Sequence, residues 1–403
     1  MERKTKIRSQ LPAVGVLDSL RRAFAVDASK SEGYVRSLLE GAGIEVGGSA
    51  PHDIQVLDKE FYLRVLRDGS LGLGESYMDG QWEAESLDQA LHLLLLGKLD
   101  VVARRNLALV VHTIKAKLLN LQTKVRAFEV GEHHYDIGNE LYKGMLDRNM
   151  AYTCGYWRTG ATTLDDAQTA KLDLVCRKLG LKPGMRVLEL GCGWGGFAKY
   201  AAEHYDVSVL GYTVSKEQAA FASEWTSGLS VEIRTQDYRD ASGQFDAVVS
   251  IGLMEHVGPK NYRTYMELVD RCLTPEGTAL VHTIAGNRAI AHMEPWFEKY
   301  IFPNAVLPTI GSLAMAIDDL FVCEDVHNIG PDYDTTLLAW NDRFNNIWPQ
   351  LQADNPTKYS DRFYRMWTYY LLCSAAGFRA RYTQLFQMVL TRPGTTQPDC
   401  RCL

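Results

Sequence analysis

The stretch Arg186-Val-Leu-Glu-Leu-Gly-Cys-Gly-Trp-Gly-Gly196 decides the fold class of this chain. It begins with a short, mostly apolar run, and four glycines are then spread over the last six residues. This pattern is typical of a buried strand that ends in a tight turn before a helix. We therefore expect a strand over 186–190, a ligand-binding turn over 191–196, and a helix from Phe197 to His204.

Strand and helix patterns alternate on both sides of this turn. A helical pattern covers 164–179, and another helix begins near Ser215. Short apolar runs predict further strands over 207–211, 231–234, 245–251 and 278–283. The alternation predicts an α/β, Rossmann-like fold: a mostly parallel, doubly wound sheet with helices on both faces. In such sheets ligands bind beyond the carboxyl ends of the strands.

Length and composition exclude several classes of protein. The 403 residues suffice for one large domain and a smaller one. A net charge of -6 argues against nucleic acid as the main partner. The eight cysteines include no CxxC pair, which argues against structural zinc and favours a reducing compartment. No run reaches the roughly 18 apolar residues of a transmembrane helix, and 11–16 is too short for a signal peptide, so we expect a protein that is soluble or peripheral to a membrane.

The segment from Lys98 to Arg126 differs from the rest of the chain. Apolar residues recur in it at helical spacing, and seven lysines and arginines accompany a single acid, Asp100. The segment thus carries +6, and the remainder carries -12. A basic amphipathic helix suits an anionic membrane surface. A helix packed between domains, with solvated lysines, fits the same residues equally well.

The glycine turn has the spacing GxGxxG, which by itself fits either a dinucleotide or S-adenosylmethionine (SAM). A dinucleotide site needs an acid at the end of the second strand to bind the ribose. The chain has Gly211-Tyr-Thr-Val-Ser215 there, without an acid. The acid instead precedes the turn, at Glu189, which suits the amino-acid part of SAM. We therefore predict a SAM-dependent methyltransferase rather than an NAD-dependent oxidoreductase.

Other residues along this pattern are suited to the rest of SAM. Thr213 and Gln218 can hydrogen-bond the ribose, and Asp237 and Tyr238 can bind and stack on the adenine. Asp237 also fits a turn acid, and Tyr238 a core aromatic. Within the turn, the predicted contacts come from four residues: Gly191, Gly193, Trp194 and Gly195.

Four further side chains stand out near strand ends and loops: Cys154, Glu255, His282 and Tyr333. Taken singly, each has an ordinary explanation. A cysteine among aromatics is usually core filler, a histidine after an apolar strand is usually a core residue, and Tyr333 between two aspartates is typical of an exposed loop.

The motifs around these residues together resemble those of cyclopropane-fatty-acyl-phospholipid synthases. The resemblance covers nearly the whole chain, including the N-terminal part. It rests on these stretches: Tyr152-Thr-Cys-Gly-Tyr-Trp157, Leu188-Glu-Leu-Gly-Cys-Gly-Trp-Gly-Gly196, Glu255-His-Val-Gly-Pro-Lys-Asn-Tyr262, His282-Thr-Ile284, Asp332-Tyr-Asp-Thr-Thr336, Gly69-Ser-Leu-Gly-Leu-Gly-Glu-Ser-Tyr-Met-Asp-Gly80 and Trp367-Thr-Tyr-Tyr-Leu371.

The resemblance implies a reaction in which the cis double bond of a phospholipid acyl chain attacks the methyl group of SAM. The resulting carbocation needs a dry pocket lined by aromatic faces. Candidates for these faces are Tyr156, Trp157, Tyr300, Phe302 and Tyr369. A bound bicarbonate is then implied as the base that removes a proton, so that the cyclopropane ring closes.

The same resemblance assigns roles to individual residues. His282, Tyr333 and the Ile284 backbone N–H would donate to the bicarbonate, Glu255 would accept from its hydroxyl, and Cys154 would be a weak donor rather than a nucleophile. Three further residues are implied as SAM contacts: Tyr135, Tyr152 and Thr153, the last a serine in many relatives.

The residue patterns and the resemblance together predict the organisation of the chain. Residues 1–125 would form a small helical domain that associates with lipid, together with a linker helix. Residues 126–392 would form the catalytic domain, and 393–403 a disordered tail. The expected setting is cytoplasmic, peripheral to the inner face of the cell membrane, with unsaturated phospholipid as substrate and a homodimer by analogy.

Three alternatives remain open. A related enzyme could methylate the same alkene and stop at a methyl branch, and small-molecule N-methyltransferases share the fold. A noncatalytic lipid-binding protein on a Rossmann-like scaffold would keep the amphipathic helix, but it would not need the set Cys154, Glu255, His282 and Tyr333.

Overall fold

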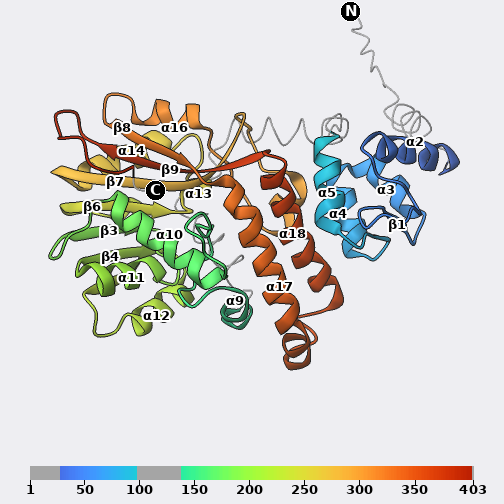
Figure 1. Ribbon diagram of the computed structural model, residues 1–403, viewed down its shortest axis with the longest axis horizontal. Coiled ribbons are helices and arrows are strands. Elements are labelled where there is room, and N and C mark those ends of the chain that lie inside the picture. The colour runs from blue at the N-terminus through green and yellow to red at the C-terminus, as the bar shows by residue number, and fades with distance from the viewer. Residues whose placement is uncertain (1–27, 98–137, 402–403) are drawn as a thin grey trace, which may run out of the picture.

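A seven-stranded sheet lies at the centre of the larger part of the computed structural model, which describes residues 28–97 and 138–401 (Figure 1). The strand order is β5 (Val231–Thr235), β4 (Ser208–Thr213), β3 (Arg186–Leu190), β6 (Phe245–Ile251), β7 (Leu273–Gly286), β9 (Thr383–Thr391) and β8 (Val322–Asn328). The strands from β5 to β7 are parallel, and β9 is antiparallel to both of its neighbours. The predicted α/β fold with a mostly parallel sheet is confirmed.

The predicted parallel strands agree with the structure, and two of them, β3 and β6, match to the residue. β7 is longer than expected because it continues past the parallel region to pair with β9 as far as Gly286. The antiparallel strands β8 and β9 were not predicted. β8 is an edge strand with charged residues at Glu324 and Asp325, so it lacks the apolar run of its buried neighbours.

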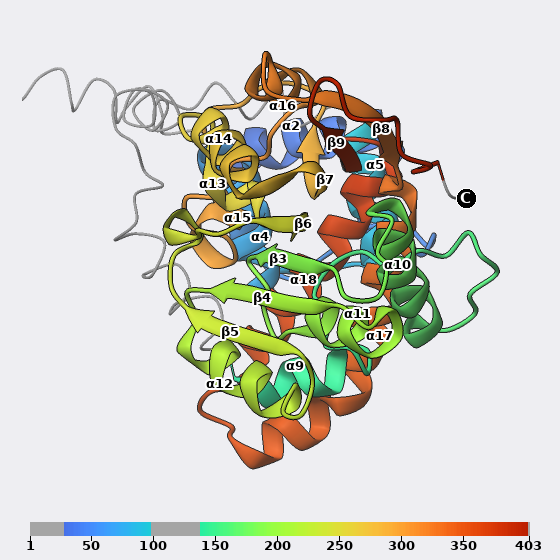
Figure 2. The same cartoon turned by 90° about the vertical axis from the view of Figure 1, so that its left-hand side faces the viewer.

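Helices cover both faces of the sheet, because successive side chains of a strand point to opposite sides. Val187 of β3 packs in one apolar cluster with α10 (Leu164–Lys178) and α11 (Gly196–Tyr205). Leu188 and Leu190 pack in another with α13 (Met254–Val257), α14 (Tyr262–Cys272) and α16 (Ile310–Ile317). Figure 2 shows α10 and α14 on opposite sides of the strands. α12 (Lys216–Trp225) follows β4.

A third apolar cluster joins the catalytic part to the N-terminal unit, by which we mean residues 28–97. The unit's helices are α2 (Ala28–Gly41), α3 (Glu60–Asp68), α4 (Ser70–Met78) and α5 (Leu87–Leu96), with a small ladder of β1 (Gln55–Val56) and β2 (Trp82–Glu83). On the catalytic side the cluster contains residues of α9 (Asn139–Met145), α17 (Gly330–Asp354) and α18 (Asp361–Arg379). The two parts therefore share one core.

The glycine-rich stretch Gly69–Tyr77 lies largely within α4. Two of its glycines allow close packing. A Cβ on Gly72 would lie 2.3 Å from the Arg64 carbonyl oxygen, and one on Gly74 would lie 2.4 Å from the Trp296 ring. Tertiary packing thus outweighs the low helix propensity of glycine. A turn follows at Asp79–Gly80, with Gly80 at a φ of 73°.

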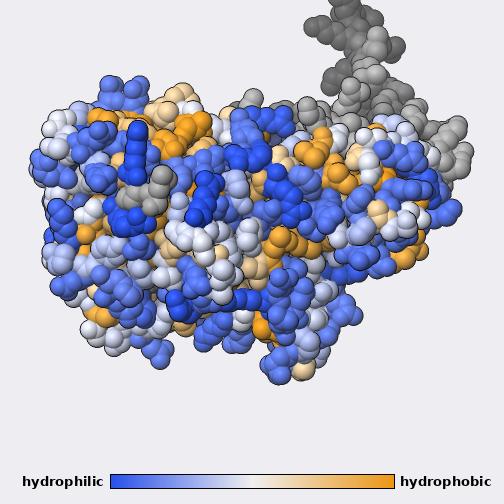
Figure 3. All heavy atoms as spheres, in the orientation of Figure 1, coloured by the Kyte–Doolittle hydropathy of each residue, from blue (hydrophilic) through white to orange (hydrophobic). Residues whose placement is uncertain are grey.

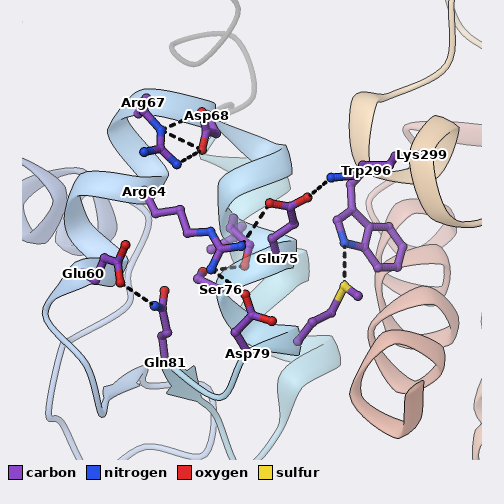
Figure 4. A network of polar contacts seen from close by, with 12 residues as sticks. Glu60, Arg64, Arg67, Asp68, Glu75, Ser76, Asp79, Gln81, Trp296 and Lys299 are labelled. Carbon is purple, nitrogen blue, oxygen red and sulfur yellow. Dashed lines mark hydrogen bonds and ion pairs between the residues drawn. The ribbon is translucent and has the colours of Figure 1, made fainter. Parts of the chain in front are cut away.

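Carboxylates of the N-terminal unit bridge to the catalytic part (Figure 4). Glu75 accepts hydrogen bonds from Arg64 at 3.0 Å, and from Lys299 and Tyr300 of α15 (Pro295–Tyr300). Asp79 accepts from Arg362 of α18 at 2.8 Å. Burial opposes the ionised form of Glu75, yet these donors lower its pKa to about 2. The unit is therefore held against α15 and α18 by charge as well as by apolar packing.

The C-terminal segment differs from the prediction of a disordered tail. Cys400 is buried against the sheet, and Gln397 donates to Glu324 of β8 at 3.0 Å. An apolar anchor and a polar contact thus order residues 393–401, and the prediction of disorder is wrong for that stretch. The basic segment 98–126, the expected domain boundary at 125–126 and Tyr135 lie outside the described residues.

Candidate active site

A cavity of about 950 Å³ opens at the carboxyl ends of the parallel strands, where the fold predicts a ligand. Its wall includes the glycine turn at one end and apolar residues of α15, α18 and the loop after β7 at the other. Leu95 of α5 also lines it, so the N-terminal unit contributes to the wall. A volume of this size is in the range for small-molecule sites.

The structure brings nearly all of the predicted SAM residues to one end of this cavity. Those that line it are Tyr152, Thr153, Glu189, Gly191, Gly193, Trp194, Thr213, Gln218, Asp237 and Tyr238. Gly195 does not line it; it caps α11 with a left-handed φ of 83°. Gly191, at a φ of 80°, lets the chain leave β3 and turn back beneath the cavity.

The residues expected to bind the ribose and adenine also contact one another. The Thr213 hydroxyl donates to the Gln218 amide oxygen at 3.0 Å. Asp237 accepts from the Arg239 backbone N–H at 2.9 Å and pairs with the Arg239 guanidinium, so the turn-acid interpretation also holds. The guanidinium of Arg239 lies over the Tyr238 ring, and Arg239 lines the cavity too, a residue that sequence analysis missed.

Buried charges lie beneath the glycine turn. Burial raises the pKa of Glu189 to about 8, against the opposing effect of the Lys171 ammonium. Burial also lowers the pKa of Lys171 to about 8. The Glu189 Oε2 atom has no hydrogen-bond partner. Lys171 donates to the Thr153 hydroxyl at 2.9 Å. Lys171 was not among the predicted site residues, although a lysine on the buried stripe of a helical pattern is a usable signal.

Four of the five residues expected to hold the base line the cavity: Glu255, His282, Ile284 and Tyr333. Glu255 lies on α13, just after β6, and His282 and Ile284 lie on β7, the neighbouring strand. Tyr333 comes from the first turn of α17 and packs on Phe378 of α18. Adjacent strand ends and a helix start thus bring together residues that are far apart in sequence.

Cys154 does not line the cavity. Its thiol is fully buried, donates to the Gly155 carbonyl at 3.1 Å and lies 3.9 Å from the Thr336 hydroxyl. Burial, followed by the field of Asp332, raises its pKa well above the ordinary value. The thiol is therefore neutral and packed in the wall, which agrees with a residue that is not a nucleophile.

The Ile284 backbone N–H was predicted to donate to a ligand, but it has a partner within the protein. It donates to the Glu255 Oε1 atom at 2.6 Å, so these two groups satisfy each other. Burial nevertheless raises the pKa of Glu255 to about 7, and its Oε2 atom has no partner. A carboxyl with this pKa is poised between its two protonation states near neutral pH.

His282 is buried and neutral. Burial, followed by the fields of Lys171 and Lys178, holds its pKa well below the ordinary value. Its Nδ1 atom lies 3.3 Å from the Gln387 amide nitrogen of β9, and its Nε2 atom has no partner. With the amide as donor, the ring carries its proton on Nε2 and can donate it to a ligand.

The aromatic residues that line the cavity are mostly not those suggested by sequence. Of the five candidates, only Phe302 does so. Phe297, Tyr370, Phe378 and Tyr382 line it as well. On α18, Tyr370 faces the cavity, whereas Tyr369 packs against Trp296 with ring centres 4.6 Å apart. The helical rotation between neighbours, which residue type alone does not reveal, decides which ring contacts a ligand.

In the part of the chain that the structure describes, no group of three or more histidine, cysteine or acidic side chains could hold a metal ion. None of the described helices is both long and apolar enough to cross a membrane.

Comparison with known proteins agrees with this geometry. A SAM-dependent methyltransferase fold is shared with the solved mycolic acid cyclopropane synthase CmaA1 complexed with SAH and CTAB: TM-score 0.61 at 29% identity, over 66% of this chain and 98% of that one. The family described as mycolic acid cyclopropane synthetase matches residues 122–388. The chain belongs to this family.

Two curated relatives indicate the range of chemistry in it. The cyclopropane-fatty-acyl-phospholipid synthase of Escherichia coli (strain K12) is 52% identical over 88% of this chain and 92% of that protein. The tuberculostearic acid methyltransferase UfaA1 of Mycobacterium tuberculosis is 32% identical over 82% of this chain and 81% of that protein. The chain is thus a SAM-dependent methyltransferase of the cyclopropane synthetase family.

Proposed function

We propose that this protein transfers a methylene unit from SAM to the cis double bond of an unsaturated phospholipid acyl chain, forming a cyclopropane ring. One observation carries the proposal: a single cavity joins the SAM end to an apolar, aromatic end, with Glu255 and His282 in its wall. The 52% identity to the Escherichia coli synthase supports phospholipid as the substrate.

The residues present fit SAM, which supplies an electrophilic methyl group when bound. The glycine turn leaves room for the ligand, and Glu189 offers an unpartnered buried oxygen beside it. Thr213 and Gln218 offer hydroxyl and amide groups in the same wall. Because an alkene has no proton to lose before it attacks, the main task of these residues is to position the methyl group.

A bicarbonate ion also fits the residues present, and when bound it supplies a base. Glu255 Oε2 and His282 Nε2 are buried polar atoms without partners, and both residues line the cavity. Unpartnered buried polar atoms are costly, so a small polar ligand that satisfies them is favoured. His282 would donate to it, Glu255 would accept from its hydroxyl, and Tyr333 has the right chemistry to assist.

The apolar end of the cavity suits a cationic intermediate on the acyl chain. The faces of Phe297, Phe302 and Tyr370 can stabilise positive charge without attacking it. Their apolar surroundings also exclude water, which would quench the cation. No charge-bearing nucleophile is needed, which agrees with the neutral state of Cys154.

The second candidate is methylation of the same alkene without ring closure. It is favoured by the 32% identity to a tuberculostearic acid methyltransferase. The polar pair of Glu255 and His282 favours ring closure, because it can hold a base where the proton must be removed.

We further propose that the N-terminal unit associates with the membrane surface and that the protein works as a homodimer, peripheral to the cytoplasmic face. Four exposed large apolar side chains of the unit support the lipid contact: Tyr34, Leu57, Leu63 and Leu96. Figure 3 shows one face of the molecule, on which apolar residues form separate patches among hydrophilic ones.

The proposal is tested by incubating the protein with SAM and vesicles of cis-unsaturated phospholipid. Mass spectrometry of the fatty acids should show a gain of one CH₂, and proton NMR should show loss of the olefinic signals. Vesicles of saturated phospholipid are the matched control and should show no gain. No gain with the unsaturated lipid would refute the assignment.

A further inference from the structure

Two lysines on α10, Lys171 and Lys178, are each only 1% exposed. Lys178 has the partner expected of a buried cation, since Asp325 lies 2.7 Å from its ammonium. Lys171 has no carboxylate within ion-pair distance in the described parts of the chain. Its hydrogen bond there goes to a neutral group, the Thr153 hydroxyl, at 2.9 Å. A buried ammonium in this state is not neutralised by a direct ion pair.

Lys171 lines the SAM end of the cavity together with Glu189. The Glu189 Oε2 atom is also without a partner. Among the described residues, Lys171 therefore has no ion-pair partner, and one oxygen of Glu189 has no hydrogen-bond partner. Both residues line the same end of one cavity. An α-amino acid group, which bears a carboxylate and an ammonium, is the complementary ligand.

Thr153 is held in place on three sides. The Gln168 side chain donates to its carbonyl at 2.6 Å, and its methyl group packs over Gly252, where an added Cβ would lie 3.2 Å away. Lys171 donates to its hydroxyl oxygen. Because that oxygen already accepts a hydrogen bond, the hydroxyl proton is left for donation to a group in the cavity.

We propose that Lys171 is a positioning residue for the amino-acid group of the methyl donor: it orients the Thr153 hydroxyl toward the carboxylate and supplies the counter-charge. The hydrogen bonds then run from the Lys171 ammonium to the Thr153 hydroxyl and on to the ligand carboxylate. Both are charge-assisted, and each strengthens the other. The proposal rests on SAM as the donor and is independent of the acceptor lipid.

The test is calorimetric binding of two ligands to the full chain. S-adenosylhomocysteine carries the amino-acid group, and 5′-methylthioadenosine lacks it. Lys171→Met should weaken the first by roughly 10- to 100-fold, the range for a hydrogen bond to a charged group. It should leave the second within about twofold. Equal loss of both ligands would show a merely structural role, and no loss of either would also overturn the proposal.

Lys178→Met is the matched control, because it removes the other buried lysine of the same helix, one that does not line the cavity. It should leave both affinities unchanged. Should Lys171→Met fail to fold, Thr153→Val provides the same test, and it should show the same selective loss, whereas Thr153→Ser should not. Failure to make a lipid product would leave these affinities intact, so the two proposals fail separately.

Discussion

At the scale of single residues, the chemistry depends most on Glu255. Burial raises its pKa to about 7, and its ionised form is the stronger acceptor of a hydrogen bond from a bound hydroxyl. We expect kcat to rise with pH through this pKa when bicarbonate is saturating. Glu255→Gln should lower kcat by about 100-fold or more and abolish this pH dependence.

The measurement is a pH–rate profile of both proteins, with calorimetric SAH binding as the control. Binding should be nearly unchanged, because Glu255 is expected to contact the base rather than SAM. If kcat of Glu255→Gln still rose with pH over the same range, the rise would belong to another titrating group.

Glu189 should favour binding of SAM but lower the stability of the folded protein as the pH rises. Burial raises its pKa from the ordinary 4.5 to about 8, so the folded protein holds this proton more tightly than the unfolded chain. The contribution of Glu189 to stability is therefore complete below about pH 4.5 and is lost as the pH rises to about 8. Glu189→Gln avoids this loss.

The melting temperature of Glu189→Gln relative to the natural protein should therefore rise between these pH values, while its affinity for SAH falls. A difference in melting temperature that does not change with pH would contradict the assigned pKa.

Sequence could predict most of the residues that line the cavity near the glycine turn, because they follow strand ends in a fixed order. It could not show that Cys154 points into the wall, or that Ile284 donates to Glu255. These facts depend on side-chain direction and on partners contributed by distant elements. Lys171 was missed for a related reason, since only the structure shows that its ammonium donates to the Thr153 hydroxyl and forms no ion pair with the described residues.

At the scale of elements, the close approach of α4 to α15 is one of the contacts that join the N-terminal unit to the cavity. Gly74 has no room for a Cβ against Trp296, and the next residue of α15, Phe297, lines the cavity. Gly74→Ala should therefore cost about 1–3 kcal/mol of stability by overpacking, and should also lower turnover. Thermal unfolding and the lipid assay measure the two effects.

Gly33→Ala in α2 is the matched control, because an added Cβ there meets nothing within 4 Å. It should leave stability equal or higher by up to about 1 kcal/mol, with unchanged turnover. Equal destabilisation by both variants would contradict the packing argument.

The elements that sequence predicted best are the central parallel strands. β3 and β6 are buried on both faces, so their residues are mostly apolar and their ends are sharp. β8, at the edge, carries charges, and α4 is rich in glycine. The formation of both elements depends on tertiary contacts, which the local sequence pattern does not reveal.

At the scale of the whole molecule, charge is divided unevenly. The segment 98–126, which lies outside the described residues, carries +6 in a chain of net -6. Charge reversal at Arg104, Arg105, Lys115 and Lys117 should weaken binding to anionic vesicles, with each charge worth about 1 kcal/mol near the surface. Vesicle co-sedimentation at low and high salt measures this.

Reversal at Lys182 and Lys216, exposed lysines of the catalytic part, is the control and should have little effect. Unchanged vesicle binding in the fourfold variant would exclude this segment as the membrane contact and leave it as a packed helix.

The most direct test of ring formation is the fate of deuterium from SAM labelled with CD₃. If a base removes a proton from the transferred methyl group and the ring closes, the product retains two deuterium atoms per added carbon. High-resolution mass spectrometry of the fatty acids from unsaturated phospholipid vesicles should therefore show a CD₂ unit in a cyclopropane product. Retention of all three deuterium atoms in a methyl-branched product would contradict the account.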